Sequence, residues 1–281
     1  MSDPMYKLNE IKRDEYNRPS GVVAINKPAD VTSHDLVNEL RKKLGTRKVG
    51  HAGALDVFAD GVMIYLIGKA TKQSDKLIHL DKEYVTTILL GVSTESQDTE
   101  GKITEIKTGY KIKDISDIDS KLTKFVGDQK QYVSAYSSVK VSGKKLRNIM
   151  RDDKYDKIIQ FNDKNEKIIS LTPKNSDSQT KNVEVIIPSK KIKIYELELL
   201  ESGDIPVSKL KSIKKQLTNI PGSQTFPFVK IRVKSSKGTY IRQLAEDIGQ
   251  ELNMPAMLLN LTRTRVGDIS LEKCIALDNI N

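Results

Sequence analysis

The residues best suited to chemistry lie in one glycine-rich loop. It reads Gly50-His51-Ala52-Gly53-Ala54-Leu55-Asp56 and is closed by Ala59-Asp60-Gly61. Glycines let the backbone turn sharply and let a flat ligand approach it, while Leu55 and Phe58 can anchor the loop in the protein. Asp56 would then face outward as a reactive carboxylate. The loop alone leaves a second interpretation open, in which Asp56 caps the next element or forms an Asx-turn.

The segments around this loop are predicted to alternate between strands and helices. A buried strand over 21–25 ends at Asn26-Lys27-Pro28, and a helix follows, with Thr32 or Ser33 as its N-cap. The helix has apolar residues at helical spacing and basic residues toward and beyond its C-terminal end, namely Leu36, Val37, Leu40 and Leu44, then Arg41, Lys42, Lys43, Arg47 and Lys48. Beyond the loop we expect a strand at 62–67, a helix at 69–80 and a strand at 83–90.

The second half of the chain is predicted to be rich in strands. We expect a loop or hairpin connection at 91–101, a strand at 102–107, an amphipathic helix at 114–125 and, within the polar segment 151–182, a hairpin. Alternation resumes over 183–200 and 229–233, and Lys230, Arg232 and Lys234 give the second of these strands a basic face. A helix then runs through Leu244, Ala245, Ile248 and Leu252. These elements indicate a mixed α/β protein.

The composition limits the class of protein. Lysine and arginine total 47 against 37 acidic residues, a net charge of +10, which suggests a polyanionic partner such as nucleic acid. No apolar run has the length of a membrane span and residues 1–20 are polar, so we expect a cytoplasmic protein with no membrane partner. The single cysteine, Cys274, excludes an internal disulfide. Because His34, His51 and His79 are scattered, we predict no metal.

Five segments, in order along the chain, resemble the successive motifs of the TruB family of tRNA pseudouridine synthases. They are Gly21-Val22-Val23-Ala24-Ile25-Asn26-Lys27-Pro28, Gly50-His51-Ala52-Gly53-Ala54-Leu55-Asp56, Asp81-Lys82-Glu83-Tyr84, Tyr136-Ser137 with Lys140, and Ser236-Lys237-Gly238-Thr239-Tyr240-Ile241-Arg242. The resemblance covers roughly residues 20–266, and ordered motifs are far more specific than a single one. It implies a pseudouridine synthase fold of the α+β class, with a central, largely antiparallel sheet flanked by helices and an RNA-clamping insertion.

The activity implied by the resemblance is isomerisation of the uridine at position 55, in the T-loop of tRNA, to pseudouridine, with no cofactor and no metal. The base must first be flipped out of the RNA. The expected partner is the T-arm of tRNA, and the expected state is a monomer. Two other functions stay open. One is a tRNA-binding or folding-helper protein with little catalysis, and the other is a pseudouridine synthase that acts on ribosomal RNA.

Three residues match the catalytic positions of the family. One aspartate is essential there, and Asp56 matches it; its carboxylate can add covalently to the substrate or stabilise positive character at the anomeric carbon. A carboxylate in a partly dry pocket tends to bind a proton unless a cation lies beside it. By motif position that cation is Arg242, whose planar fork suits a carboxylate. Tyr84 is expected to stack on the uracil, and a role as proton acceptor is open.

Other residues match positions that bind the substrate. Tyr240 would form a wall of the uracil pocket, and His51 would stack in the gap left by the flipped base. Lys27 and Pro28 match a motif that supports the floor of the site near the substrate. Cations available for phosphates are Lys140 with Lys144, Lys145, Arg147 and Arg151 in the insertion, and Arg41, Lys42, Lys43, Arg47, Lys48, Lys230 and Lys237 elsewhere.

The chain is predicted to divide into three parts. These are a polar N-terminal extension over 1–19, a catalytic domain over 20–270 and a short C-terminal tail over 271–281, with no additional C-terminal RNA-binding domain. The catalytic domain contains the RNA-binding insertion, at about 127–151, and the polar excursion, at about 151–182.

The chain also departs from the family pattern. Val57 and Phe58 follow Asp56 where Pro and Leu are usual, and Asp60 adds a carboxylate that could repel phosphate or point to solvent. Asp30 replaces a usual glycine, and aspartate tolerates left-handed backbone better than most residues. Val133-Ser134 stand where two prolines are frequent, so the path of the insertion is left open.

Overall fold

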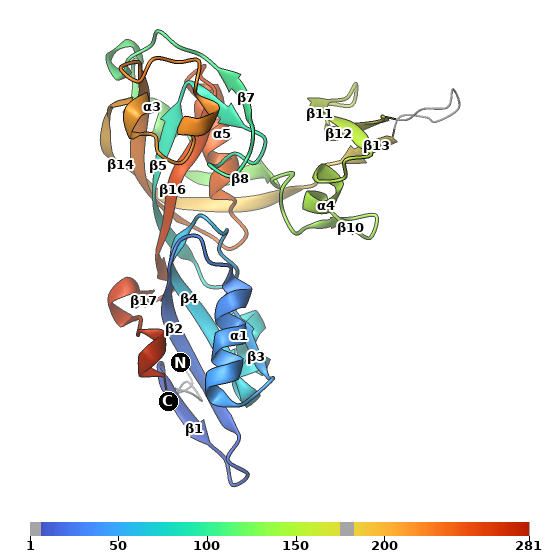
Figure 1. The fold of residues 1–281 in the computed structure, drawn as a ribbon, viewed down its shortest axis with the longest axis vertical. Helices are drawn as coiled ribbons and strands as arrows, with labels where there is room; N and C mark the ends of the chain where they lie inside the picture. Colours follow the sequence, from blue (N-terminus) through green and yellow to red (C-terminus); the bar gives the residue numbers. More distant parts are fainter. Residues whose placement is uncertain (1–6, 175–182, 281) are drawn as a thin grey trace.

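One ten-stranded sheet organises the protein, in a computed structural model that describes residues 7–174 and 183–280 (Figure 1). The order across it is β1 (Glu10–Arg13), β2 (Pro19–Lys27), β4 (Asp60–Ile67), β16 (Ala256–Val266), β5 (Lys82–Leu90), β15 (Thr225–Ser235), β14 (Ser189–Pro206) and β8 (Gly127–Tyr132). Short strands β3 (Val49–His51) and β17 (Ile269–Ser270) pair with β4 and β16. Adjacent strands are antiparallel except β4 and β16, which run parallel. The predicted, largely antiparallel central sheet is confirmed.

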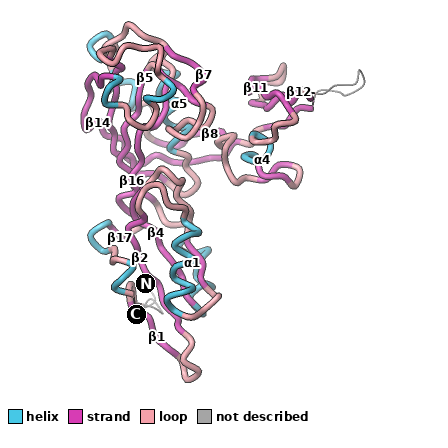
Figure 2. The backbone as a smooth tube through the Cα atoms, viewed as in Figure 1, coloured by secondary structure: helices cyan, strands magenta, loops and turns pink. Residues whose placement is uncertain are grey.

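Helices lie at the periphery of this sheet, as the tube in Figure 2 shows. The described residues form α1 (Ser33–Leu44), α2 (Ser74–Ile78), α3 (Ile118–Thr123), α4 (Leu146–Met150) and α5 (Ile241–Glu251). Short 3-10 turns occupy Gly68–Gln73, Ile112–Asp114, Val207–Lys209, Lys214–Gln216, Leu271–Lys273 and Leu277–Asn279. Helix α1 contacts β2 and β3, and α5 contacts β16 and β8. This arrangement confirms the mixed α+β class.

Helix α1 forms as its sequence predicts. The Thr32 side chain accepts from the backbone N–H of Asp35, whose carboxylate accepts from the Thr32 N–H in return, and this capping box fixes the first turn. Gly45 ends the helix in the left-handed conformation. The apolar residues at helical spacing, Leu36, Val37, Leu40 and Leu44, are all buried.

Two predicted helices are shorter than expected. The helix expected at 69–80 is a 3-10 turn over Gly68–Gln73 followed by the single α-helical stretch α2. The helix expected at 114–125 is reduced to α3, because the Asp114 carboxylate closes a separate turn by accepting from the Lys111 N–H, and Asp117 has a positive φ of 55°. Local side-chain hydrogen bonds compete here with a continuous helix.

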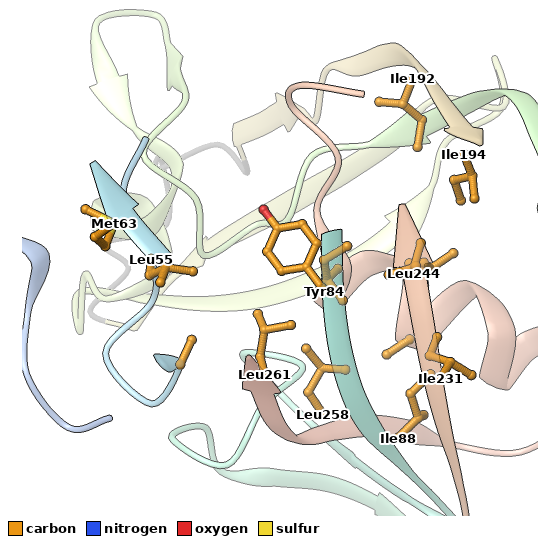
Figure 3. Close-up of a cluster of buried hydrophobic side chains, with 14 of the residues drawn as sticks. Leu55, Met63, Tyr84, Ile88, Ile192, Ile194, Ile231, Leu244, Leu258 and Leu261 are labelled. Carbon is orange, nitrogen blue, oxygen red and sulfur yellow. The ribbon is translucent and has the colours of Figure 1, made fainter. Parts of the chain in front are cut away.

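The main core lies between the sheet and helices α1 and α5, and it reaches the glycine-rich loop. Figure 3 shows Tyr84 of β5 in this cluster, with its hydroxyl directed toward the side where Leu55 and Met63 lie. Leu55 is buried, and Phe58 packs against the same cluster, so both anchor the loop as expected. Strand β16, which the sequence did not single out, runs through the centre of the sheet and completes this core.

The segment between β8 and β14 projects to one side of the body (Figure 1). It contains β9 (Lys140–Val141), β10 (Lys144–Lys145), α4, and a separate sheet of β11 (Tyr155–Phe161), β12 (Lys167–Pro173) and β13 (Val183–Ile186). Its own apolar cluster includes Val133, Leu146, Ile169, Leu171 and Ile187. The hairpin expected in 151–182 is β11 with β12, while residues 175–182 lie outside the described part. A further hairpin, β6 (Val92–Thr94) with β7 (Ile103–Ile106), agrees with the connection expected at 91–101.

Candidate active site

Asp56 and Arg242 form an ion pair with two contacts. Arg242 Nε lies 2.9 Å from Asp56 Oδ2, and Arg242 Nη2 lies 3.2 Å from Oδ1. The Arg242 side chain is only 9% exposed, whereas that of Asp56 is 40% exposed. A buried fork therefore holds the carboxylate in one orientation while leaving it accessible to a ligand. The contact expected from the motifs is present, and the chain brings it together from residues on the loop and on α5.

A second carboxylate, Asp98, lies on the other side of the guanidinium. Arg242 Nη1 is 3.3 Å from Asp98 Oδ2 and donates to the Ser96 carbonyl at 3.0 Å. The Asp98 side chain is 1% exposed and accepts from the Glu100 N–H and the Ser96 hydroxyl. Burial raises the pKa of Asp98, and the charge of Arg242 opposes this. Sequence reasoning missed Asp98, since it stood only as one polar residue in a loop.

The loop that carries Asp56 is fixed from below by Lys27. This lysine is fully buried, and its ammonium donates to the carbonyls of Pro28 at 2.8 Å, Val31 at 2.7 Å and Val57 at 3.2 Å. All three N–H donors are thus used on the backbone. Burial lowers the pKa of Lys27. Lys27 therefore ties the backbone at Pro28 and Val31 to that at Val57, and it has no free donor for a phosphate.

The unusual residues Asp30 and Val57 are accommodated together. Asp30 has a positive φ of 63°, which agrees with the tolerance expected of aspartate. Its N–H donates to the Val57 carbonyl at 2.8 Å. The same carbonyl also accepts from Lys27, so two hydrogen bonds hold the loop at Val57.

A buried arginine, Arg263 of β16, holds the other end of the loop. It is 2% exposed, and it donates to the Val62 carbonyl at 2.7 Å and the Gly53 carbonyl at 3.2 Å. Gly61, with φ +114°, lets β16 approach, because a Cβ there would lie 2.3 Å from the Arg263 carbonyl oxygen. Sequence reasoning missed Arg263. The available signal was the alternation of residue types within 256–266, which places Arg263 on the same face of the strand as buried residues.

The two tyrosines approach the site from different elements. Tyr84, on β5, is 8% exposed, and Tyr240 is the half-buried N-cap residue of α5. Burial raises the pKa of the Tyr240 phenol; the charge of Arg242 lowers it and that of Asp56 raises it. Tyr84 packs in the main apolar core together with Leu55 of the loop, and Tyr240 packs against the apolar cluster that contains Val133 and Leu146.

His51 and Asp60 each have a buried polar atom without a hydrogen bond among the described residues. In His51 this atom is Nδ1, and burial lowers the pKa of the imidazole, assisted by the charges of Arg263 and His34. The surroundings of this loop residue therefore disfavour the charged form of the imidazole. In Asp60 the atom is Oδ1, and the carboxylate raises the pKa of Lys27 by its charge. Asp60 thus faces inward rather than pointing to solvent.

The other residues predicted to bind the substrate or its phosphates make no contact with the Asp56–Arg242 pair among the described residues. Pro28 is exposed beside the floor of the site, and Lys140 is exposed on the β9–β10 hairpin of the insertion. Arg41 is occupied, because its guanidinium donates to the Arg47 and Val49 carbonyls.

The basic face expected on 229–233 is neutralised. Lys230, Arg232 and Lys234 lie 3.9, 2.7 and 3.3 Å from glutamates of β14. Those partners are Glu201, Glu198 and Glu196, which the antiparallel register of β14 and β15 places opposite or nearly opposite the cations. Cross-strand pairs of opposite charge stabilise a sheet modestly. Lys230, Arg232 and Lys234 therefore lie on one face, as expected, and each has a carboxylate beside it.

A cavity of about 1420 Å³ lies against α5 but does not contain Asp56, Tyr84, Tyr240 or Arg242. Its lining includes Gln131, Gln243, Asp247 and Phe161. In residues 7–174 and 183–280, no group of three or more acidic, histidine or cysteine side chains could hold a metal ion. Nor does any helix in that part of the chain have the length and apolar character needed to cross a membrane.

Comparisons with known proteins identify the class of enzyme to which this fold and the accessible Asp56–Arg242 pair belong. A family model described as TruB family pseudouridylate synthase (N terminal domain) matches residues 41–187. The tRNA pseudouridine synthase B of Geobacillus thermodenitrificans is 32% identical over 260 residues, covering 92% of this chain and 71% of the relative. That of Parabacteroides distasonis is 36% identical over 267 residues, covering 92% and 91%.

Solved structures show the same fold. The Cbf5-Nop10-Gar1 complex contains a chain that aligns with a TM-score of 0.51 at 23% identity, covering 99% of this chain and 60% of that one. The archaeal box H/ACA sRNP Nop10-Cbf5 complex gives a TM-score of 0.52 at 21% identity, covering 99% and 58%. The family model and the relatives place the chain among the pseudouridine synthases. The protein belongs to the TruB family.

Proposed function

We propose that this protein isomerises the uridine at position 55, in the T-loop of tRNA, to pseudouridine. The observation that carries the proposal is the Asp56 carboxylate, held by the buried Arg242 fork and still 40% exposed. The name shared by the relatives, tRNA pseudouridine synthase B, supports tRNA as the substrate. Membership of the TruB family supports uridine isomerisation as the reaction.

Asp56 is the essential catalytic residue of this proposal. As the bond from the sugar carbon to the uracil nitrogen breaks, the electron pair leaves with the base and positive character develops on the sugar. The Asp56 carboxylate either adds to the substrate or stabilises that charge. The uracil then turns, a carbon–carbon bond forms at the same sugar carbon, and the proton on the attacking carbon passes to a base. Arg242 orients the carboxylate for either route.

The aromatic residues would hold the flipped uridine. Tyr84 stacks on the uracil and is the candidate acceptor for the final proton, while Tyr240 forms a wall of the pocket. His51 stacks in the gap left by the flipped base. Lys27 and Pro28 maintain the floor, and Lys140 meets phosphate from the insertion. No cofactor or metal takes part in this scheme.

The partner in this proposal is the T-arm of tRNA, and the protein acts as a monomer in the cytoplasm. The predicted division at residues 1–19, 20–270 and 271–281 is retained, with the insertion at about 127–151 as the part that grips the RNA. Exposed cations on that insertion, such as Lys140, Lys144 and Arg151, support this role.

Release of tritium from tRNA labelled at carbon 5 of uracil tests the function, because that proton leaves only when the new bond forms. We expect release from an unmodified tRNA transcript, and none from a transcript with cytidine at position 55. Tight binding without release would instead indicate a folding helper. Reaction of ribosomal RNA fragments with an inert tRNA would indicate the ribosomal alternative.

A further inference from the structure

Gln131, at the end of β8, makes reciprocal hydrogen bonds with the main chain of Tyr240. The Tyr240 N–H donates to Gln131 Oε1 at 2.8 Å, and Gln131 Nε2 donates to the Tyr240 carbonyl at 3.1 Å. The glutamine is 4% exposed, so the pairing is protected from water. One side-chain amide thus pairs with both the backbone N–H and the backbone carbonyl of Tyr240, as a neighbouring strand would do in a sheet.

The surroundings of Tyr240 come from the same part of the chain. Lys190 of β14, the register partner of Gln131, has its Nζ 5.7 Å from the centre of the Tyr240 ring. Burial raises the pKa of the Tyr240 phenol, and the Ser137 side chain opposes this. The ring packs with the apolar cluster of the insertion. The backbone and the ring of Tyr240 are therefore both held by the insertion, which includes β8, and by β14.

Tyr240 is also directly connected to the catalytic pair. It is the N-cap residue of α5, and its side chain makes no capping hydrogen bond. Arg242 follows in the first turn and donates to Asp56 from Nε and Nη2. Because a helix is rigid over one turn, the position of the Tyr240 peptide sets where the Arg242 side chain begins.

We infer that Gln131 is a positioning residue through which the RNA-gripping insertion fixes Tyr240 and the Asp56–Arg242 pair for turnover. This inference rests on the proposed function, which it deepens. The insertion then has two roles, since it holds RNA with its exposed cations and builds one wall of the active site with its first strand. A competing account makes Gln131 only a partner for two buried backbone groups, important for folding but not for catalysis.

Gln131→Met separates these accounts, because it keeps length and volume but removes both hydrogen bonds. We expect kcat on tRNA to fall on the order of tenfold, with the dissociation constant for tRNA unchanged within about twofold. The matched control is Gln129→Met on the same strand, whose amide donates to the Lys124 carbonyl instead. It should retain the wild-type kcat. A wild-type kcat in Gln131→Met, or a loss of RNA affinity alone, overturns the inference.

Gln131→Glu provides a second test, in a variant that can keep one or both of the hydrogen bonds to Tyr240. An ionised glutamate accepts from the Tyr240 N–H but cannot donate to its carbonyl, whereas the protonated form can do both. We therefore expect the ratio of its kcat to that of the wild type to rise as the pH is lowered. The charged groups near this position, Lys190, Lys167, Glu246 and Asp247, are the same in both proteins. A ratio independent of pH contradicts the inference.

A substrate-free measurement keeps this inference distinct from the proposed function. The Arg242 Nε–H resonance, assigned by its loss in Arg242→Lys, should exchange with solvent faster in Gln131→Met than in the wild type or in Gln129→Met. Equal exchange rates overturn the inference, whatever the substrate. Absence of turnover in the wild-type protein, by contrast, rejects the proposed function.

Discussion

Arg242 donates to the two carboxylate oxygens of Asp56 from two different nitrogens, at 2.9 and 3.2 Å. A lysine at this position could offer only a point charge, and it would leave the carboxylate free to rotate. The third nitrogen of the fork, Nη1, is used on Asp98 and the Ser96 carbonyl. The guanidinium is therefore fixed on both sides, and the orientation of Asp56 is set before any RNA binds.

Asp56→Asn should abolish turnover while leaving RNA affinity largely intact, because the amide has nearly the same shape but no negative charge. We expect tritium release to fall by on the order of a thousandfold or more. Filter binding of tRNA measures the affinity in parallel. Asp128→Asn, an exposed change on β8, serves as the control. Retained turnover in Asp56→Asn would remove this residue from the mechanism.

Asp98→Asn should reduce kcat without weakening RNA binding, because Arg242 loses one of the two carboxylates that fix it. The buried position predicts a loss of folding stability of about 1–3 kcal/mol as well. Combining it with Arg242→Lys should add little to the loss of kcat from Arg242→Lys alone, since both changes act on one network. Fully additive effects on kcat would show that Asp98 acts independently of Arg242.

Salt should weaken RNA binding through the insertion and not through the paired face of β15. Replacing Lys140, Lys144 and Arg151 by glutamine should reduce the slope of log affinity against log salt by about two. The matched control replaces Lys230, Arg232 and Lys234, which already pair with glutamates. That control should leave the slope unchanged, and an equal reduction in both triple variants would refute this assignment of phosphate contacts.

Asp247 should make folding stability depend on pH. Burial raises its pKa from the usual 3.8 to about 6, and the charge of Glu246 adds to this. Between these values the folded protein retains a proton that the unfolded chain releases, so this group lowers the free energy of unfolding as the pH rises.

Asp247→Asn therefore should gain stability relative to the wild type between pH 4 and 6, by on the order of 2 kcal/mol, and keep that gain at higher pH. Urea unfolding at a series of pH values measures the difference. Asp75→Asn, exposed on α2, is the control and should show no such gain. A gain that shrinks as the pH rises would have the wrong sign for this account.

Arg263→Met should destabilise the protein by about 2 kcal/mol or more, because the carbonyls of Gly53 and Val62 lose their donors. It should also raise the pKa of His51, since the charge of Arg263 helps to lower it. Arg263→Lys keeps the charge and should leave the His51 titration closer to the wild type. Proton NMR of the His51 ring follows this titration. An unchanged His51 pKa in Arg263→Met would show that the charge of Arg263 does not act on His51.

Local sequence was sufficient where the determining interactions are local. Thr32 or Ser33 was expected to cap the start of α1, and the structure chooses Thr32; the tolerance of aspartate for positive φ explained Asp30 in place of glycine. The motifs also identified the Asp56–Arg242 contact, although the two residues are 186 positions apart, because a resemblance carries tertiary information that spacing lacks.

The sequence by itself determined the glycine loop, its single outward carboxylate, the helix that precedes it and the family to which these motifs belong. Only the tertiary structure decided that Asp98 and Gln131 meet the catalytic helix, that Arg263 supports the loop, and that glutamates of β14 neutralise the cations of β15. The physical reason is the strand order. The parallel contact of β4 with β16 and the register of β14 on β15 bring together segments that are far apart in the chain, and their polar residues find partners only there.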